Sequence, residues 1–165
     1  MRELRANAPS AGVMDKLRLS IDGASKGNPG AAGIGVVLSD EAGNVLKEIS
    51  EYIGETTNNV AEYTALLRGL EEALALGARS AQVISDSQLL VCQLDGRYKI
   101  KAPHLRRLNE TARALMAKFR QVSISHVPRE QNAHADRLAS QAAERVKEAE
   151  KLVAETQDDG QQTLF

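Results

Sequence analysis

The sequence has one cysteine, no tryptophan and no apolar run long enough to cross a membrane. Cys92 is the only cysteine among 165 residues, which excludes an internal disulfide and a cysteine-rich zinc site. The first fifteen residues carry charges but lack the apolar core of an export signal. We therefore expect a cytoplasmic protein that has no membrane partner. A chain of this length predicts one domain with a substantial core.

The chain also lacks a large excess of either charge. Its formal net charge is −1, which argues against a strongly basic nucleic-acid binder. Residues 16–143, however, carry 16 Lys and Arg against 14 Asp and Glu. Within that region a run without acidic residues forms a basic cluster of Arg97, Lys99, Lys101, Arg106 and Arg107. Such a run is as typical of a solvated face as of a surface that binds a polyanion.

The segment from Leu17 to Asp40 contains the first functional pattern. Apolar and polar residues alternate up to Asp22, which predicts a half-buried strand that ends in a carboxylate. The turn-forming sequence GASKGNPG follows. The glycine order G-x-x-G-x-G and the hairpin after it exclude a dinucleotide-binding loop. An exposed strand-end acid without a function remains the alternative for Asp22.

The remaining sequence predicts alternating strands and helices. Three strands near residues 16–22, 32–39 and 45–53 form an antiparallel meander. Apolar residues at steps of three and four then predict a helix that begins in TTNNVAEY and ends at Gly77. The later predicted elements are a strand at 80–85, a helix at 87–94, a helix at 103–120, a strand at 121–127 and a helix from 133 to about 155.

Three further acids stand at the ends of these elements. Glu62 projects from the first turn of its helix, although Asn59 and Glu62 also fit a capping box. Asp86 ends a strand that should run parallel to the first one, beside Asp22; its alternative is a helix cap. Asp136 lies in the first turn of the last helix, where the helix dipole favours an acid anyway. We expect all four acids to meet at one sheet edge.

Four carboxylates gathered at one place repel one another, so they require a cation. Hard oxygen ligands without partner cysteines or paired histidines favour Mg²⁺ or Mn²⁺ over zinc. Two such ions about 3.5–4 Å apart suit the in-line hydrolysis of a phosphodiester. The sequence therefore predicts two ions at the acidic edge.

Four separated segments carry a resemblance to a known family. IDGASKGNPGAAGIGVV, TTNNVAEYTAL, ISDSQ and HVPREQNAHADRLAS resemble a type 1 ribonuclease H over about residues 16–143. The resemblance implies an α/β ribonuclease H-like fold with a five-stranded mixed sheet and helices on both faces. It also implies cleavage of the RNA strand of an RNA–DNA hybrid, leaving a 3′-hydroxyl and a 5′-phosphate. The implied catalytic and metal-binding residues are Asp22, Glu62, Asp86 and Asp136.

The resemblance further implies a set of substrate contacts. Short amides and hydroxyls suit this role because they can bond 2′-hydroxyls and base edges in a shallow minor groove. Capping or turn formation is the alternative for the three asparagines. The implied contacts are Asn28, Asn58, Asn59, Ser87 and Gln88.

Two departures from the family pattern affect binding and catalysis. The segment before Pro103 lacks the long basic, Trp-containing insertion of some members, although Arg97, Lys99 and Lys101 partly replace it. We therefore expect weaker and more salt-sensitive binding of the hybrid. The mobile histidine of some members is not securely matched. The open candidates for an assisting role are His126, Arg129, Glu130 and His134.

The two terminal segments have different predicted structures from residues 16–143. Residues 1–15 are predicted to be a flexible leader, and residues 144–165 a charged helical extension followed by a flexible tail. Gln161, Leu164 and Phe165 resemble the Gln-x-x-Leu-Phe peptide with which bacterial proteins dock on the replication sliding clamp. An apolar end that folds back on the domain is the alternative.

Two other functions remain open for the domain, which we expect to be a monomer. One is a nuclease of the same fold that acts on a different nucleic acid. The other is a non-catalytic module that binds hybrids, although the presence of all four acids disfavours it.

Overall fold

The computed structural model describes residues 15–163. The expectations for the leader up to residue 14 and for Leu164 and Phe165 lie outside the described residues. Among the helices of the described part, none has the length and apolar character needed to cross a bilayer.

Five strands form one mixed sheet in the order β3-β2-β1-β4-β5. Strands β1, β2 and β3 pair antiparallel, whereas β4 runs parallel to β1 and β5 parallel to β4. The predicted fold class is confirmed. The strands are β1 (Lys16–Gly27), β2 (Gly30–Ser39), β3 (Val45–Thr56), β4 (Ser80–Ser85) and β5 (Gln121–His126).

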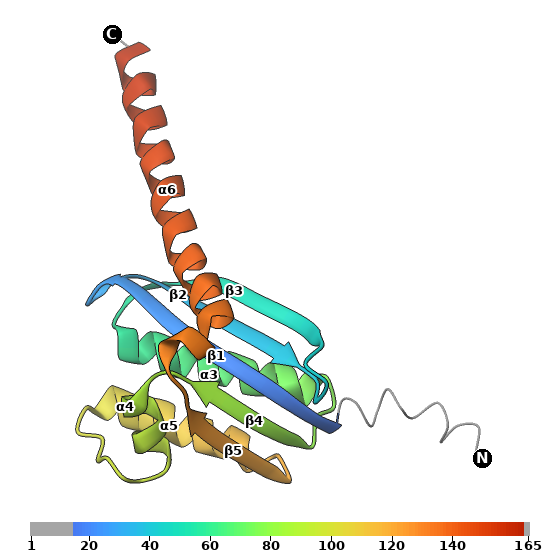
Figure 1. Ribbon diagram of the computed structural model, residues 1–165. Coiled ribbons are helices and arrows are strands. Elements are labelled where there is room, and N and C mark those ends of the chain that lie inside the picture. Colours follow the sequence, from blue (N-terminus) through green and yellow to red (C-terminus); the bar gives the residue numbers. More distant parts are fainter. Residues whose placement is uncertain (1–14, 164–165) are drawn as a thin grey trace.

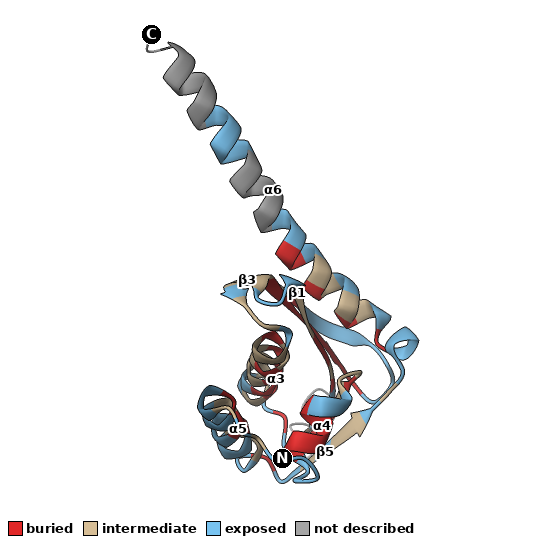
Figure 2. Ribbon diagram, turned by 90° about the vertical axis from the view of Figure 1, so that its left-hand side faces the viewer, coloured by how far each residue is buried: buried red, intermediate tan, exposed pale blue. Residues whose placement is uncertain are grey.

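Helices cover both faces of the sheet (Figures 1 and 2). Helix α3 (Asn58–Ala75) packs on one face of β1 and β2, and α6 (Ala133–Thr163) packs on the other face. Helices α4 (Gln88–Leu94) and α5 (Pro103–Met116) lie on the α3 side. Because both faces of β2 are covered, most of that strand is buried, which explains its continuous apolar run.

The alternation of β1 divides its side chains between the two faces. Leu17, Leu19 and Ile21 are fully buried and belong to the core that contains the apolar side of α3. Asp22 follows with the opposite orientation, because successive strand residues point to opposite faces. The strand therefore delivers a carboxylate to the α6 side of the sheet.

Several element bounds differ from the predicted ones. Strand pairing continues through the polar GASKGNPG segment as far as Gly27 and Gly30, so β1 is longer than predicted. Helix α5 ends at Met116, before the predicted end at Arg120. Helix α6 continues beyond the predicted end near Glu155 to Thr163 and projects away from the sheet (Figure 1).

Helix α6 approaches β2 at positions that only glycine permits. A Cβ atom at Gly35 would lie 2.7 Å from the backbone nitrogen of Ala139 and 2.9 Å from the Cβ of Leu138. Gly33 meets the next turn of α6 in the same way, 2.7 Å from the backbone nitrogen of Ala143. The glycines therefore set how closely the start of α6 lies on the sheet.

We expect Gly35→Ala to destabilise the fold by roughly 1–3 kcal/mol, because the added methyl group meets helix backbone that cannot yield locally. Thermal unfolding measures the loss. Gly69→Ala is the matched control, since its nearest neighbour is the Cγ1 atom of Val36 at 3.2 Å and alanine favours a helix. An equal loss of stability in both variants would contradict the close-approach argument.

Candidate active site

Asp22 and Asp86 stand side by side at the ends of two parallel strands. Ser20 of β1 is in register with Ile84 of β4, and each acid follows two residues further along its chain. Ser87, not Asp86, caps helix α4, because its hydroxyl accepts a hydrogen bond from the backbone N–H of Leu90 at 3.1 Å. The capping alternative for Asp86 is therefore wrong.

Glu62 reaches the same place because α3 lies directly against β1. A Cβ atom at Gly23 would meet the backbone nitrogen of Glu62 at 2.5 Å, so this glycine allows the contact. The helix is capped by Thr57, whose hydroxyl accepts from the backbone N–H of Val60 at 3.3 Å. The capping box of Asn59 and Glu62 is thus not formed, and Glu62 stands beyond the first turn.

Asp136 is placed by a buried asparagine that the sequence did not single out. The Asn132 side chain donates a hydrogen bond to the backbone oxygen of Ile21 at 2.8 Å, and its backbone oxygen accepts from the N–H of Asp136 at 3.1 Å. Asn132 therefore ties the start of α6 to the residue before Asp22. The only sequence signal for it is an asparagine directly before a predicted helix.

One cavity of about 410 Å³ brings the four acids together. Two cations also line this cavity, Lys26 and Arg129. The predicted convergence at the sheet edge is thus observed. The complete lining is Asp22, Gly23, Ala24, Ser25, Lys26, Asn58, Glu62, Asp86, Arg129, Asp136 and Ser140.

Burial, together with neighbouring charge, raises the pKa values of three of these carboxyl groups, Asp22, Glu62 and Asp86. Burial, followed by the charge of Asp86 and a hydrogen bond with Asp136, raises the pKa of Asp22 from 3.8 to about 9. Burial also raises the pKa of Asp86, although a hydrogen bond with Asp22 opposes that rise. A protonated Asp22 that donates to its neighbours accounts for both effects. Burial and mutual repulsion thus oppose the ionisation of Asp22 and Asp86 side by side.

Glu62 has a buried oxygen without a partner. Its Oε2 atom makes no hydrogen bond, and burial raises the pKa of the carboxyl group to about 7, with Ser87 opposing the rise. Among the residues that the structure describes, no three His, Cys, Asp or Glu side chains are already arranged to hold a metal ion. An unsatisfied carboxylate oxygen beside two other acids is the donor set that a hard divalent cation requires.

A second hollow of about 590 Å³ adjoins the first, and Asn58 and Glu62 line both. All five residues that the resemblance implies as substrate contacts line this hollow. Its further lining, which the sequence did not indicate, comes from Thr57 at the start of α3 and from helices α4 and α5. The full set is Asn28, Thr57, Asn58, Asn59, Glu62, Ser87, Gln88, Leu89, His104 and Leu105.

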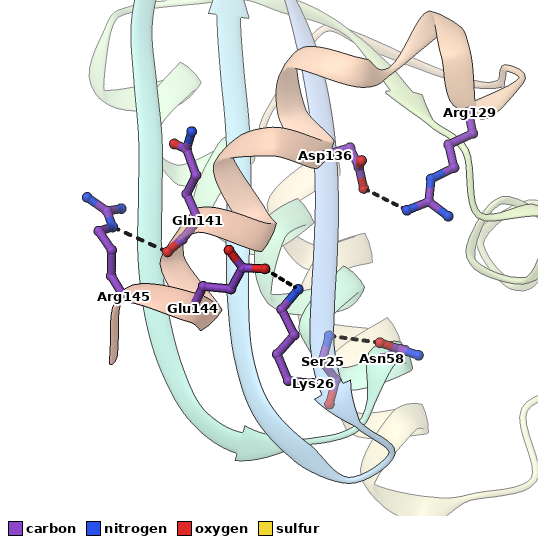
Figure 3. Close-up of polar contacts among 8 residues, drawn as sticks. All are labelled: Ser25, Lys26, Asn58, Arg129, Asp136, Gln141, Glu144 and Arg145. Carbon is purple, nitrogen blue, oxygen red and sulfur yellow. Dashed lines mark hydrogen bonds and ion pairs between the residues drawn. The ribbon is translucent and has the colours of Figure 1, made fainter. Parts of the chain in front are cut away.

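Hydrogen bonds fix two of these asparagines. The Asn28 side-chain oxygen accepts from the backbone N–H of Asn58 at 3.1 Å, and the Asn58 side-chain oxygen accepts from the backbone N–H of Ser25 at 3.0 Å (Figure 3). Each side-chain oxygen is used within the protein, whereas the side-chain N–H groups of both residues donate to no other residue of the described part of the chain. Such donors suit the oxygen atoms of a nucleic acid.

Of the predicted assisting residues, Arg129 lines the acidic cavity. Its Nη2 atom lies 3.3 Å from the Oδ1 atom of Asp136 (Figure 3). His134 contacts Glu48 on β3 instead. It precedes Asp136 by two residues, so it points about 200° away around the helix. His126 ends β5, and Glu130 is exposed in the short helix η1 (Arg129–Gln131); neither lines this cavity.

Comparison with known proteins identifies the family. Residues 20–142 match the family model described as reverse transcriptase-like. A bifunctional protein of Mycobacterium tuberculosis is 48% identical over 128 residues, covering 77% of this chain and 35% of that protein. Its N-terminal ribonuclease H domain has a solved structure with a TM-score of 0.75 and 46% identity, covering 78% of this chain and 98% of the other.

Two further relatives are also ribonucleases H. The ribonuclease HI of Halobacterium salinarum is 46% identical over 121 residues, covering 73% of this chain and 61% of the relative. A ribonuclease H1 isolated from compost, solved in complex with an RNA/DNA hybrid, has a TM-score of 0.75 and 43% identity over 79% of this chain and 98% of that one. The chain therefore belongs to the ribonuclease HI family. It spans about a third of the mycobacterial protein's length and under two thirds of the archaeal one.

The raised pKa of Asp22 makes the metal-free protein less stable as the pH rises. Below 3.8 the group is neutral in both folded and unfolded chains; between 3.8 and about 9 only the unfolded chain releases the proton. We therefore expect Asp22→Asn to raise the melting temperature in EDTA, with a larger gain at pH 8 than at pH 5.

Thermal unfolding at the two pH values measures this gain. The matched control is Asp95→Asn, because Arg97 lowers the pKa of that exposed carboxyl group and no gain is expected. A lower melting temperature for Asp22→Asn than for the wild type at pH 8 would contradict the described electrostatics.

Proposed function

We propose that this protein hydrolyses the RNA strand of RNA–DNA hybrids in a metal-dependent reaction that leaves 5′-phosphate and 3′-hydroxyl ends. The convergence of Asp22, Glu62, Asp86 and Asp136 in one cavity carries this proposal. The adjoining amide-lined hollow and the relative solved with an RNA/DNA hybrid support the choice of substrate.

The four acids would hold the cations that this chemistry requires, Mg²⁺ or Mn²⁺. The unpartnered Oε2 atom of Glu62 and the mutual repulsion around Asp22 favour such binding. Two bound divalent cations supply Lewis acids at the attacking and leaving oxygens of the phosphodiester. The protein's own contribution is to fix the four carboxylates on rigid elements before substrate arrives.

The neighbouring hollow would select RNA over DNA. The side-chain N–H groups of Asn28 and Asn58, with the side chains of Asn59 and Gln88, can donate to 2′-hydroxyl and base-edge oxygens in a minor groove. Because Asn58 and Glu62 line both hollows, a strand held in one extends directly into the other. This continuity couples recognition of the sugar to the position of the bond that is cut.

The basic cluster supplies long-range attraction to the hybrid. Its members are exposed, and Arg97 is already paired with Asp95 at 2.7 Å. Exposed pairs of this kind are screened by salt. The expectation of salt-sensitive binding therefore stands as part of the proposal.

A cleavage assay tests the proposal. We expect the wild type to cut the RNA strand of a matched hybrid in Mg²⁺ or Mn²⁺ and to leave it intact in EDTA. Asp86→Asn should lower kcat at least about 10²-fold, because a metal ligand supports several kcal/mol of transition-state stabilisation. The variant should retain hybrid binding.

Double-stranded RNA and duplex DNA of the same sequence are the substrate controls. Faster cleavage of either would replace the proposed substrate by another nucleic acid. Binding of the hybrid without cleavage by the wild type would favour a non-catalytic module, and full activity of Asp86→Asn would contradict the proposed site.

The carboxyl-terminal peptide adds a proposed partner, the replication sliding clamp. The sequence Gln161-Gln162-Thr163-Leu164-Phe165 supports this assignment. Helix α6 extends to Thr163 and projects away from the sheet (Figure 1). A helix would therefore connect the domain to the docking peptide, where the sequence predicts a flexible tail.

Deletion of residues 160–165 should abolish capture of the chain by an immobilised sliding clamp, because the docking residues are removed. Cleavage of free hybrids should remain unchanged, since the residues of α6 that line the acidic cavity, Asp136 and Ser140, belong to the first turns of the helix and not to its end. The double variant Leu164→Ala with Phe165→Ala keeps the chain length and serves as the matched test. Undiminished capture of both variants by the clamp would contradict this proposal.

A further inference from the structure

Lys26 lies in the acidic cavity, although the sequence did not single it out. It is four residues beyond Asp22 on β1, so both side chains stand on the strand face that α6 covers. At about 3.3 Å per residue, their backbone positions are about 13 Å apart. Lys26 therefore stands at the rim of the cavity, on the same strand as one of its central carboxylates.

The two cations of this cavity have different partners. Arg129 contacts Asp136 at 3.3 Å, and its charge opposes the rise in the pKa of Asp86. Lys26 is instead paired with Glu144 of α6, with 3.1 Å between Nζ and Oε1 (Figure 3). Glu144 is not part of the acidic quartet. Arg129 thus balances the quartet, whereas the charge of Lys26 is directed to the rim.

Another anion can replace Glu144 as the partner of Lys26 at a low cost in free energy. The Glu144 side chain is 61% exposed and that of Lys26 is 32% exposed. Ion pairs of such exposure contribute little to stability. A phosphodiester carries a full negative charge, as a carboxylate does, and is likewise an acceptor for a lysine ammonium group, so it can take the place of Glu144.

We propose that Lys26 binds a non-scissile phosphate of the RNA strand, and that Glu144 holds the lysine across the cavity rim until the strand displaces it. The inference rests on the proposed function and adds a positioning residue to it. The span of about 13 Å between the two backbone positions places this phosphate a few nucleotides away from the bond that is cut.

Hybrid binding in EDTA, where no cleavage is expected, tests the contact. We expect Lys26→Gln to raise Kd roughly fivefold at low salt and to reduce the slope of log K against log salt by about 0.9, because one phosphate contact is lost. A lysine with a merely structural role would leave that slope unchanged. Lys47→Gln is the matched control, since Lys47 pairs with Glu72 at 2.6 Å and lines none of the described cavities.

Glu144→Gln tests the displacement. Freed from its partner, Lys26 should bind the strand more tightly, lowering Kd by a factor of about two. The effect should vanish when Lys26→Gln is also present, because the two residues act through one contact. Equal effects of Glu144→Gln in both backgrounds would overturn the displacement.

Neutral methylphosphonate linkages, placed singly along the RNA strand, locate the phosphate. One linkage a few nucleotides away from the cleaved bond should weaken binding to the wild type but not to Lys26→Gln. A uniform response to every linkage, or the same pattern in both proteins, would overturn the assignment. If the wild type cuts no hybrid, the proposed function fails; if it cuts hybrids and Lys26→Gln binds them as the wild type does, only this inference fails.

Discussion

The repulsion among four carboxyl groups in one partly buried cavity is the constraint on which the rest of the structure depends. Burial removes the water that would screen their charges, so the pKa values of Asp22, Glu62 and Asp86 rise. A protein does not keep such an arrangement for its stability, because each of these groups would be more stable in water. The site is therefore arranged for a positive ligand, and the fold must supply the force that holds the acids together.

That force comes from contacts that take no part in the reaction. Strand register places Asp22 beside Asp86, and Gly23 lets the backbone at Glu62 lie against β1. Asn132 links the start of α6 to β1 through a buried hydrogen bond. Close packing of this kind transmits small displacements, so neighbouring positions without a carboxyl group also determine the geometry of the cavity. Rigid elements supply the acids, and the loops and strand ends around them supply the polar contacts.

Much of this arrangement can be predicted from the sequence. The alternation before Asp22 and the parallel crossover to Asp86 fix two acids by general rules of strand geometry. The cap of α3 could not be chosen from the sequence, because Thr57 and Asn59 both have side chains that cap helices, and the structure uses Thr57. Lys26 lies in a segment that reads as a turn, so the continued strand that directs it into the cavity was not foreseen. Asn132 becomes significant only when β1 lies beside it.

The most direct test of the account is an anomalous-difference map from crystals grown with Mn²⁺ and a non-cleavable hybrid. The account predicts manganese peaks within coordination distance of Asp22 and at least two of Glu62, Asp86 and Asp136, next to a phosphate of the RNA strand. Manganese bound elsewhere, with these carboxyl groups still hydrogen-bonded to one another and the hybrid in place, would contradict it.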